Sequence, residues 1–449
     1  MFACRPGAKA DGHDYAPDAV AHGAAALLVE RPLPLTVPQV QVDSVAQRLG
    51  TAAAAVHGDP TTDLAVAGIT GTNGKTTCAT LLEGVLSASG VRTGLIGTVA
   101  TRVAGRSVPG IRTTPEATDL QRLFSDMRGQ GVRAVAMEVS SHGLALGRVN
   151  GTRFAVAAFT NLTHDHLDFH GTMEAYFETK AALFAERFAR AGIVNIDDPW
   201  GRRLARRVAI PVTTVSSRGD EDADIAATRV RTTPEGSLAD IVFEGSHRAL
   251  EIGLAGDFNV GNALIVLAAA RALGVPFATV AGTLRMPWSV PGRMERIDEG
   301  QPFTVLVDYA HTPDSLARVL AATRGHVAGR VIVVIGCGGD RDQQKRPAMG
   351  AAAVRGADRV VFTNDNPRGE DPQAILAAVV AGARAARGGR WTVEPDRRAA
   401  IGEALAQARP GDAVVVAGKG HERGQQLGDR TVPFDDREVV RQLLRGASG

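Results

Sequence analysis

An apolar run that ends in a glycine-rich loop and opens a helix is the feature that most constrains how this chain can fold. The stretch is GITGTNGKTT, residues 68–77. Glycines let the backbone turn so that its N–H groups converge on phosphate oxygens at the positive end of the following helix. Lys75 would reach the β- and γ-phosphates, and a hydroxyl from Thr76 or Thr77 would bind Mg²⁺. The strict pattern G-x4-G-K-[ST] requires glycine where Ile69 stands, but the strand–loop–helix context favours a phosphate loop over an ordinary glycine turn. The predicted nucleotide-binding residues of the loop are Gly71, Thr72, Asn73, Gly74, Lys75, Thr76 and Thr77.

Strand and helix patterns alternate along the rest of the chain. This alternation predicts an α/β protein with parallel sheets, in which ligands bind at the carboxyl ends of the strands. Residues 224–253 alternate apolar and polar side chains and predict short antiparallel strands. The sequence predicts strands at 26–30, 132–139, 154–160, 193–196, 303–308, 331–336, 359–363 and 412–417, and helices at 17–23, 173–190 and 258–273.

The length of 449 residues corresponds to roughly three domains of about 150 residues each. We expect a small N-terminal α/β domain in residues 1–66, a central phosphate-loop domain in residues 67–290, and a C-terminal Rossmann-like domain in residues 291–449. The stretch MPWSVPGRMER, residues 286–296, contains three prolines or glycines in a short span and predicts a linker between the second and third domains.

The overall charge excludes several classes of partner. Lys and Arg total 50 and Asp and Glu total 48, whereas a general nucleic-acid binder needs a basic excess. Basic runs such as Arg384, Arg387 and Arg390 are typical of solvated helix faces.

Three scattered cysteines predict reduced thiols, and neither a signal peptide nor a membrane-spanning apolar run is visible. We therefore expect a cytoplasmic protein that neither binds nucleic acid nor inserts into membranes.

Two stretches in the centre of the chain carry candidate metal and acid–base residues. In MEVSSHGL, Glu138 ends an apolar strand, where a parallel sheet presents a ligand for the metal of a nucleotide. In TNLTHDHLDFHGT, residues 160–172, the candidates at the end of the next strand are His164, Asp165, His166, Asp168 and His170. The spacing of His164 and His166 leaves a zinc site open, but no CxxC or HExxH partner is present. Beside a phosphate loop, Mg²⁺ held by Glu138 and one histidine is the better interpretation. Lys180, in YFETKAALF, would by itself be interpreted as a surface lysine.

The stretch FTNDNPRGEDP, residues 362–372, contains more than a turn requires. Asp, Asn, Pro and Gly are all turn formers. A turn needs neither Arg368 nor the surrounding acids. The combination indicates a site that holds a carboxylate, an amide and a guanidinium side by side.

Taken together and in order, these motifs resemble those of the Mur ligases, an ATP-dependent family that forms amide bonds in peptidoglycan precursors. The resemblance covers nearly the whole chain. It includes the departure of the phosphate loop from the strict pattern. Within the family, DNPR together with GKGHE resembles the motifs of the branch that adds meso-diaminopimelate. The matching stretches are GTNGKTT, EVSSHGL, TNL..DHLDFHGT, GDFNVGNALIVLAA, PGRME, VDYAHTPDSL, GCGGDRDQQKRPAMG, DNPR and GKGHE.

The resemblance implies roles for matching positions. Two Mg²⁺ ions are expected on Thr77, Glu138, His166 and Lys180, with Lys180 carbamylated. Catalysis is expected from Lys75, Lys180, His166 and Glu138, and ATP contacts outside the loop from Asn262, Arg293 and Asp308. The UDP-substrate is expected on Ala8, Lys9, Ala10, Thr113, Thr114, Ser140, Leu146 and Arg148. The incoming amino acid is expected on Arg341, Asp365, Asn366, Pro367, Arg368, Gly418 and Glu422.

Two departures from the family pattern affect the UDP-substrate site. Many members carry Gln where Leu146 stands, which removes one hydrogen bond to the substrate. The family also has a strand and a DSR-like stretch ahead of the part that matches Phe2–Tyr15. The chain begins after that stretch, so three alternatives stay open: the start codon is misassigned, the sequence is trimmed, or UDP is held weakly.

The resemblance predicts a ligase whose partners are ATP, UDP-N-acetylmuramoyl-L-alanyl-D-glutamate and meso-diaminopimelate, acting as a monomer. A sister ligase that adds L-lysine, or a folylpolyglutamate synthetase, is the alternative enzyme. DNPR argues against lysine, whose far end has no carboxylate. A phosphate-loop ATPase acting as a switch or scaffold is the alternative from another class, and it leaves DNPR and GKGHE unexplained.

Overall fold

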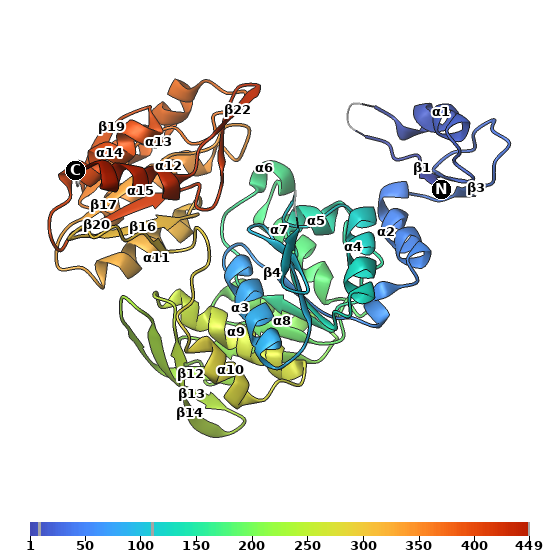
Figure 1. The fold of residues 1–449 in the computed structure, drawn as a ribbon, viewed down its shortest axis with the longest axis horizontal. Helices are drawn as coiled ribbons and strands as arrows, with labels where there is room; N and C mark the ends of the chain where they lie inside the picture. Colours follow the sequence, from blue (N-terminus) through green and yellow to red (C-terminus); the bar gives the residue numbers. More distant parts are fainter. Residues whose placement is uncertain (8–9, 109–111, 448–449) are drawn as a thin grey trace.

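The structure is a computed structural model that describes residues 1–7, 10–108 and 112–447. Within these residues the strands form sheets of three, eleven, six and two strands. Figure 1 shows the three larger sheets following one another along the chain, from the blue N-terminal part through the green and yellow centre to the orange and red C-terminal part. The predicted α/β class with parallel-rich sheets is confirmed.

The N-terminal part is a small parallel sheet with one helix. Its strand β2 lies between the other two, and Cys4, Ala16, Leu27 and Val29 form its buried core. Helix α2 is capped by Ser44, which accepts a hydrogen bond from the amide of Gln47, and leads into the central part. The elements are β1 (Phe2–Ala3), α1 (Ala16–Ala21), β2 (Leu27–Val29), β3 (Gln39–Gln41) and α2 (Val45–Val56).

The central sheet has the strand order β14-β13-β12-β11-β10-β9-β4-β8-β5-β6-β7. Its middle is parallel, and both ends are antiparallel, as predicted for residues 224–253. The strands are β4 (Ala65–Thr70), β5 (Thr93–Ile96), β6 (Thr101–Val103), β7 (Arg106–Val108), β8 (Ala134–Glu138), β9 (Val156–Phe159), β10 (Gly192–Asn195), β11 (Val212–Ser216), β12 (Ile225–Thr232), β13 (Ser237–Phe243) and β14 (Ser246–Ile252). The helices are α3 (Lys75–Ala88), α4 (Ala117–Gly129), α5 (Ser141–Ala145), α6 (Leu167–His170), α7 (Met173–Ala181), α8 (Pro199–Arg207), α9 (Phe258–Ala272) and α10 (Phe277–Leu284).

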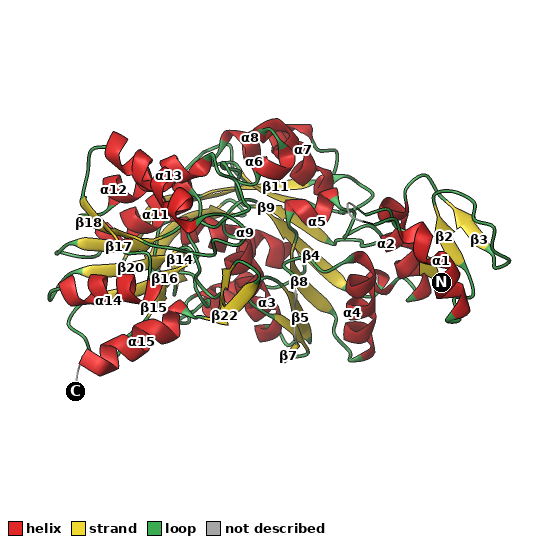
Figure 2. Cartoon of the chain, turned by 90° about the horizontal axis from the view of Figure 1, so that it is seen from above, coloured by secondary structure: helices red, strands yellow, loops and turns green. Residues whose placement is uncertain are grey.

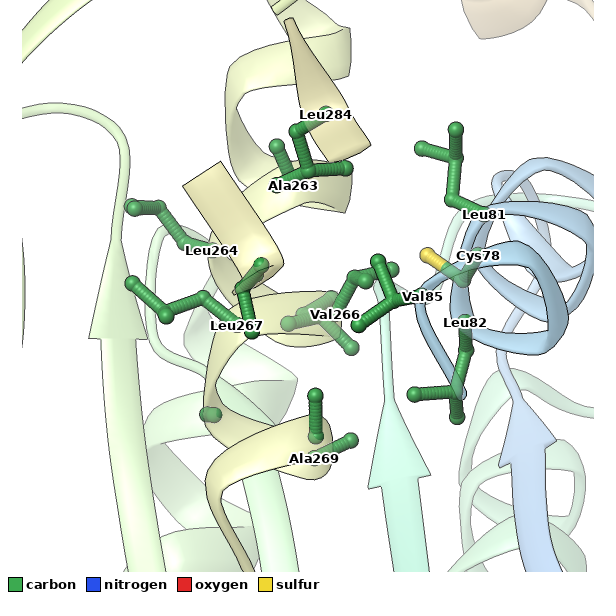
Figure 3. Close-up of a cluster of buried hydrophobic side chains, with 14 of the residues drawn as sticks. Cys78, Leu81, Leu82, Val85, Ala263, Leu264, Val266, Leu267, Ala269 and Leu284 are labelled. Carbon is green, nitrogen blue, oxygen red and sulfur yellow. The ribbon is translucent and has the colours of Figure 1, made fainter. Parts of the chain in front are cut away.

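Helix α9 is the centre of the larger apolar core. It is apolar around its circumference, which is the pattern of a helix buried on all sides. In Figure 3 the α3 side chains Cys78, Leu81, Leu82 and Val85 face those of α9, with Leu284 of α10 nearby. Helices α4, α7 and α8 contribute to a second apolar cluster. The packing of α3 against α9 fixes the start of α3, and so the phosphate loop, on the sheet.

One predicted helix ends early. The sequence predicts a helix over residues 173–190, but α7 stops at Ala181 and a 3-10 turn follows at Ala182–Phe184. Ala185 then takes an extended conformation. Leu183 and Phe184 are buried in the second apolar cluster. Tertiary burial of these side chains therefore overrides the local helical preference.

The C-terminal sheet has the strand order β15-β16-β20-β17-β18-β19 and is parallel except at β15. Helices α11, α12 and α13 cover one face, and α14 and α15 cover the other (Figure 2). The strands are β15 (Glu295–Arg296), β16 (Thr304–Asp308), β17 (Val331–Ile335), β18 (Arg359–Phe362), β19 (Arg390–Val393) and β20 (Ala413–Ala417), with a hairpin of β21 (Gly424–Leu427) and β22 (Arg430–Pro433). The helices are α11 (Pro313–Arg324), α12 (Lys345–Gly356), α13 (Pro372–Ala385), α14 (Arg397–Gln407) and α15 (Asp436–Ala447). Among the described residues, no helix is both long and apolar enough to cross a bilayer.

Candidate active site

A cavity of about 1000 Å³ lies between the central and C-terminal parts. It is lined by residues that follow β4, β8, β9 and β16, as expected for ligands at the carboxyl ends of parallel strands. The predicted residues that line it are Thr72, Asn73, Gly74, Lys75, Thr76, Thr77, Thr113, Thr114, Glu138, Ser140, Arg148, His166, Lys180, Asn262, Arg293, Asp308 and Arg341. The predicted residues that do not line it are Gly71, Ala10, Leu146, Asp365, Asn366, Pro367, Arg368, Gly418 and Glu422. Ala8 and Lys9 lie outside the described residues.

The phosphate loop follows β4 and has the conformation that only glycine adopts readily. Gly71 has φ 145°, and Gly74, the N-cap of α3, has φ 89°. A Cβ on Gly74 would lie 2.5 Å from Oδ1 of Asn262, so the helix α9 residue approaches the loop closely. The Lys75 ammonium donates to the carbonyl oxygens of Gly71 at 2.9 Å and Thr72 at 2.8 Å. Lys75 is thus positioned inside its own loop.

Glu138 lies at the end of β8 and is buried. Its Oε2 accepts from the Thr76 hydroxyl at 3.0 Å, and its Oε1 accepts from the Thr98 amide at 2.7 Å. Of the two loop hydroxyls considered from the sequence, that of Thr76 contacts Glu138, while Thr77 lines the same cavity. The described residues contain no group of three or more His, Cys, Asp or Glu suited to a metal ion. Mg²⁺ bound with a nucleotide takes one or two carboxylates, and phosphate oxygens and waters complete its shell, so Glu138 and Thr76 fit it.

Lys180 and two histidines lie against the ring of Tyr176, and a third histidine packs on one of them. The Lys180 nitrogen lies 4.7 Å from the ring centroid. His166, which has φ 55°, and His170 lie with their rings 6.2 Å and 4.9 Å from that ring, and His142 lies 4.9 Å from His166. Burial lowers the pKa of His166 to about 3 and that of Lys180 well below its usual range. Both shifts favour the neutral form, which is the form that can bind a metal or react as a nucleophile.

Three of the predicted UDP-substrate residues, Thr114, Ser140 and Arg148, form one hydrogen-bonded group. The Thr114 hydroxyl donates to the carbonyl oxygen of Glu138 at 3.0 Å, and Arg148 donates to the Thr114 carbonyl oxygen at 3.2 Å. Ser140 caps α5 by accepting from the Gly143 amide at 3.0 Å. Leu146 is half-buried at the end of α5 and is not part of this group.

Glu116 joins three arginines at the edge of this group and was not predicted from the sequence. Its carboxylate pairs with Arg112 at 2.7 Å, Arg148 at 2.9 Å and Arg5 at 3.5 Å. The Arg5 contact ties the N-terminal part to the predicted UDP-substrate residues. Only the position of Glu116, two residues after Thr114, could have indicated its importance.

The predicted ATP residues outside the loop lie on both sides of the cavity. Arg293 donates to the Thr76 hydroxyl at 3.1 Å and lies over the Tyr309 ring at 4.3 Å. Asp308 accepts from the amides of Met294 at 2.6 Å and Ala310 at 2.7 Å, and burial raises the pKa of its carboxyl. The contact of Arg293 with Thr76 joins the C-terminal part to the phosphate loop.

Asp165 provides a second link between the central and C-terminal parts, a role that its sequence motif did not indicate. Its carboxylate lies 3.2 Å from the Lys345 ammonium and 3.5 Å from Nε2 of His311. Burial by itself raises the pKa of Asp165, but His311, His166 and Lys345 outweigh it and hold that pKa well below its usual range. Nearby, His164 bonds to Asp342 at 2.9 Å. Charged contacts therefore join the central part to the C-terminal part across the cavity.

The predicted amino-acid residues form a second cluster, at the carboxyl ends of β18 and β20. Asn366 donates to Oε2 of Glu422 at 2.8 Å. Arg368 donates to the Gly339 carbonyl oxygen at 2.7 Å, and Arg341 to the Asp340 carbonyl oxygen at 2.8 Å. Neither guanidinium forms an ion pair with a carboxylate among the described residues, and Arg341 also lines the main cavity. Two free guanidiniums are suited to an incoming carboxylate.

Three family models match the chain: "Mur ligase family, catalytic domain" over residues 1–57, "Mur ligase middle domain" over 69–270, and "Mur ligase, glutamate ligase domain" over 292–420. The chain belongs to the Mur ligase family, which confirms the resemblance drawn from its motifs.

The chain is similar to individual proteins of known name, three of which are ligases with one shared name and one of which shares only the fold. A UDP-N-acetylmuramoyl-L-alanyl-D-glutamate--2,6-diaminopimelate ligase of Streptomyces coelicolor is 48% identical, with 100% of this chain and 90% of the relative covered. Its counterpart in Geobacillus thermodenitrificans is 47% identical, with 99% and 92% covered. A solved structure of a ligase with that name is 34% identical, with a TM-score of 0.70 and 100% and 92% covered. A Mycobacterium tuberculosis folylpolyglutamate synthase, at 19% identity and a TM-score of 0.68 with 89% and 94% covered, shares the fold.

Proposed function

We propose that this protein is an ATP-dependent ligase of peptidoglycan synthesis that joins meso-diaminopimelate to the D-glutamyl γ-carboxylate of UDP-N-acetylmuramoyl-L-alanyl-D-glutamate. The observation that carries the proposal is the second cluster: Arg341 and Arg368 form no ion pair with a carboxylate of the described residues, and Asp365 and Glu422 lie beside them. Diaminopimelate has one reacting amino-acid end and one held end. The held end offers a carboxylate to the guanidiniums and an ammonium to the acids. L-Lysine lacks the distal carboxylate.

The reaction needs activation because a carboxylate and an amine at neutral pH only exchange a proton. ATP transfers its γ-phosphoryl group to the γ-carboxylate and gives an acyl phosphate and ADP. The amine then attacks the acyl carbon and phosphate leaves. Lys75 and Arg293 face the developing negative charge, and bound Mg²⁺ would neutralise the phosphate oxygens. Thr76 or Thr77, Glu138 and His166 would hold the metal.

Lys180 fits the predicted carbamylation. Its pKa is held well below the usual range by burial, and only an unprotonated amine adds to carbon dioxide. The resulting carbamate would place a negative charge next to the phosphate loop, within reach of Lys75. We propose this modified side chain as part of the metal and substrate site.

Closure over the acyl phosphate excludes water from it. The contacts of Asp165 with Lys345 and of His164 with Asp342 join the two parts that enclose the cavity. We propose the stretch Pro287–Gly292 as the hinge between residues 67–290 and residues 291–449. The substrates are cytoplasmic metabolites, so we place the protein in the cytoplasm, and we expect it to act as a monomer.

The test is phosphate release from ATP and the UDP-muramoyl-dipeptide, measured with meso-diaminopimelate, L-lysine, L-glutamate or no amino acid, together with mass spectrometry of the product. We expect rapid release and a new amide product only with diaminopimelate. Preference for another amino acid would contradict the proposed substrate. ATP hydrolysis without any amide product would favour a switch ATPase instead.

A further inference from the structure

Lysine is scarce in this chain, which makes each lysine informative. It occupies only five of the 50 Lys and Arg positions, at Lys9, Lys75, Lys180, Lys345 and Lys419. Arginine therefore supplies almost all of the surface cations. The described lysines lie in the phosphate loop, beside Tyr176, at Asp165 and in the amino-acid cluster. Because Lys and Arg are not interchangeable at confined sites, a lysine retained in such a composition indicates a specific requirement for a compact ammonium group.

Lys419 has no function in the mechanism so far, yet its side chain is completely buried. It follows β20, between Gly418 and Gly420, which have φ 109° and 54°. Its ammonium donates to Oδ1 of Asn366 at 3.1 Å, Oε2 of Glu422 at 3.1 Å and the carbonyl oxygen of Gly424 at 2.7 Å. These three acceptors match the three donors of an ammonium group.

Asn366 completes this arrangement. Its Oδ1 accepts from both Lys419 and the Gln426 amide, the latter at 2.9 Å, and its Nδ2 donates to Oε2 of Glu422. Most of its hydrogen-bonding capacity is thus used within the protein. Oε2 of Glu422 is likewise occupied by two donors, whereas no hydrogen bond within the described chain engages its Oε1.

The Asp365 carboxylate is also free of hydrogen bonds from the described residues, although the Asp365 backbone carbonyl accepts from Gln425 at 2.8 Å. The groups available to a ligand are therefore the Asp365 carboxylate, Oε1 of Glu422 and the two free guanidiniums. Asn366, which the family resemblance assigns to the incoming amino acid, makes its hydrogen bonds to Lys419, Gln426 and Glu422 instead.

We propose that Lys419 is a positioning residue of the amino-acid site: together with Asn366 it fixes Glu422 so that Oε1 faces the ammonium of the incoming amino acid. This inference rests on the proposed function. Lys419 also offsets one of the two acidic charges of the cluster. With Lys419 counted, the two carboxylates leave one net negative charge, and the two guanidiniums add two positive charges. The held end of diaminopimelate meets these charges, and the fixed position of Glu422 determines where the ammonium of that end lies.

The test compares Lys419→Met, Glu422→Ala and the double variant in steady-state assays. Lys419→Met should raise the KM for diaminopimelate by about tenfold or more, the effect of losing charge-assisted hydrogen bonds, and leave the KM values for ATP and the UDP-substrate within about twofold. Because Lys419 acts through Glu422, adding Lys419→Met to Glu422→Ala should cause little further change. Additive losses, an unchanged KM for diaminopimelate, or equal changes for all three substrates would overturn the proposal.

Asn366→Ala provides a second variant that keeps Lys419, in case Lys419→Met does not fold. It removes the other donor to Oε2 and should raise the same KM selectively, so an unchanged value would also overturn the proposal. Arg330→Met is the matched control, because Arg330 pairs with Asp412 at 2.6 Å just before the start of β20. It removes an ion pair at the opposite end of the strand and should leave all three KM values unchanged.

The wild type is first assayed with the amino-acid panel described above. If it uses an amino acid other than diaminopimelate, the proposed function fails, and the variants are then measured with the amino acid it does use. A selective rise in that KM would still support the positioning of Glu422 by Lys419. The two proposals can therefore fail separately.

Discussion

The side-chain nitrogen of Lys180 lies 2.9 Å from the carbonyl oxygen of Gly71, in the phosphate loop. The lysine is only 1% exposed, and no carboxylate among the described residues pairs with it. A buried ammonium without a counter-ion is strongly disfavoured, which is why burial lowers its pKa. The residue thus lies beside the phosphate loop, where burial favours the neutral amine.

Lys180→Ala should be nearly inactive, and a short carboxylic acid such as acetate or formate should restore part of the activity by replacing the carbamate. The measurement is the rate of phosphate release against acid concentration. Lys75→Ala serves as the control, because an acid cannot replace an ammonium group and should restore nothing. An unmodified Lys180 in intact-mass spectra, combined with normal activity of Lys180→Ala, would contradict the carbamylation.

Gly74 and Gly90 flank the two ends of α3 and allow a matched comparison. Both have positive φ, 89° and 84°, so alanine at either should cost about 1–2 kcal/mol of stability. A Cβ on Gly74 also meets Asn262, whereas a Cβ on Gly90 meets nothing within 4 Å. Gly74→Ala should therefore weaken ATP binding strongly and Gly90→Ala should not. Urea unfolding and calorimetric titration with an ATP analogue measure the two effects, and equal ATP affinities would show that the close approach to Asn262 is unimportant.

Arg368 should determine the preference for diaminopimelate over lysine. Leaving one partner of a buried charge pair unpaired costs about 2–5 kcal/mol. At about 1.4 kcal/mol per factor of ten, this predicts a preference of roughly 30-fold to several-thousand-fold in kcat/KM. Arg368→Ala should reduce kcat/KM sharply for diaminopimelate and much less for lysine, because only diaminopimelate loses a partner.

The control for this comparison is Arg398→Ala, on the exposed face of α14, which should leave both kcat/KM values unchanged. Equal losses for the two amino acids in Arg368→Ala would mean that Arg368 supports the loop through its bond to Gly339 instead. The Arg368 variant should not become an efficient lysine ligase, because Asp365 and Glu422 remain arranged for an α-ammonium.

Three half-buried histidines should make the protein less stable in mild acid. Burial lowers the pKa of His166 and His421 to about 3 and that of His170 to about 4, from an unfolded value of about 6.5. Between the folded and the unfolded pKa values, the three histidines are protonated in the unfolded chain and unprotonated in the folded chain. The free energy of unfolding should therefore be highest above about pH 6.5 and fall as the pH decreases toward about 4.

Urea unfolding at several pH values measures this dependence. His421→Gln should reduce the slope, since Nδ1 of His421 is buried without a hydrogen-bond partner among the described residues. His22→Gln, at a side chain that is 77% exposed, should leave the slope as in the wild type. A wild-type stability that does not change over this range would refute the prediction.

The sequence was sufficient for features whose pattern is local. The phosphate loop follows from glycines between an apolar strand and a helix, and Glu138 from its place at the end of a strand. The antiparallel strands in residues 224–253 follow from alternation with a period of two. In contrast, the helix predicted over residues 173–190 was too long, because burial of Leu183 and Phe184 in the core ended it at Ala181.

The residues of the amino-acid cluster show what only the tertiary structure decided. Local pattern and family resemblance indicated that Asp365–Arg368 and Gly418–Glu422 matter, because strand ends and turn chemistry are properties of short segments. The contact of Asn366 with Glu422 depends on β18 and β20 lying on either side of β17, an order that no segment specifies by itself. The contacts of Lys419, Asp165 and Glu116 were not predicted for the same reason: their partners lie far away in the chain or across a turn. The sequence determined which chemical groups each strand end presents, and long-range packing of the sheets determined which of those groups meet.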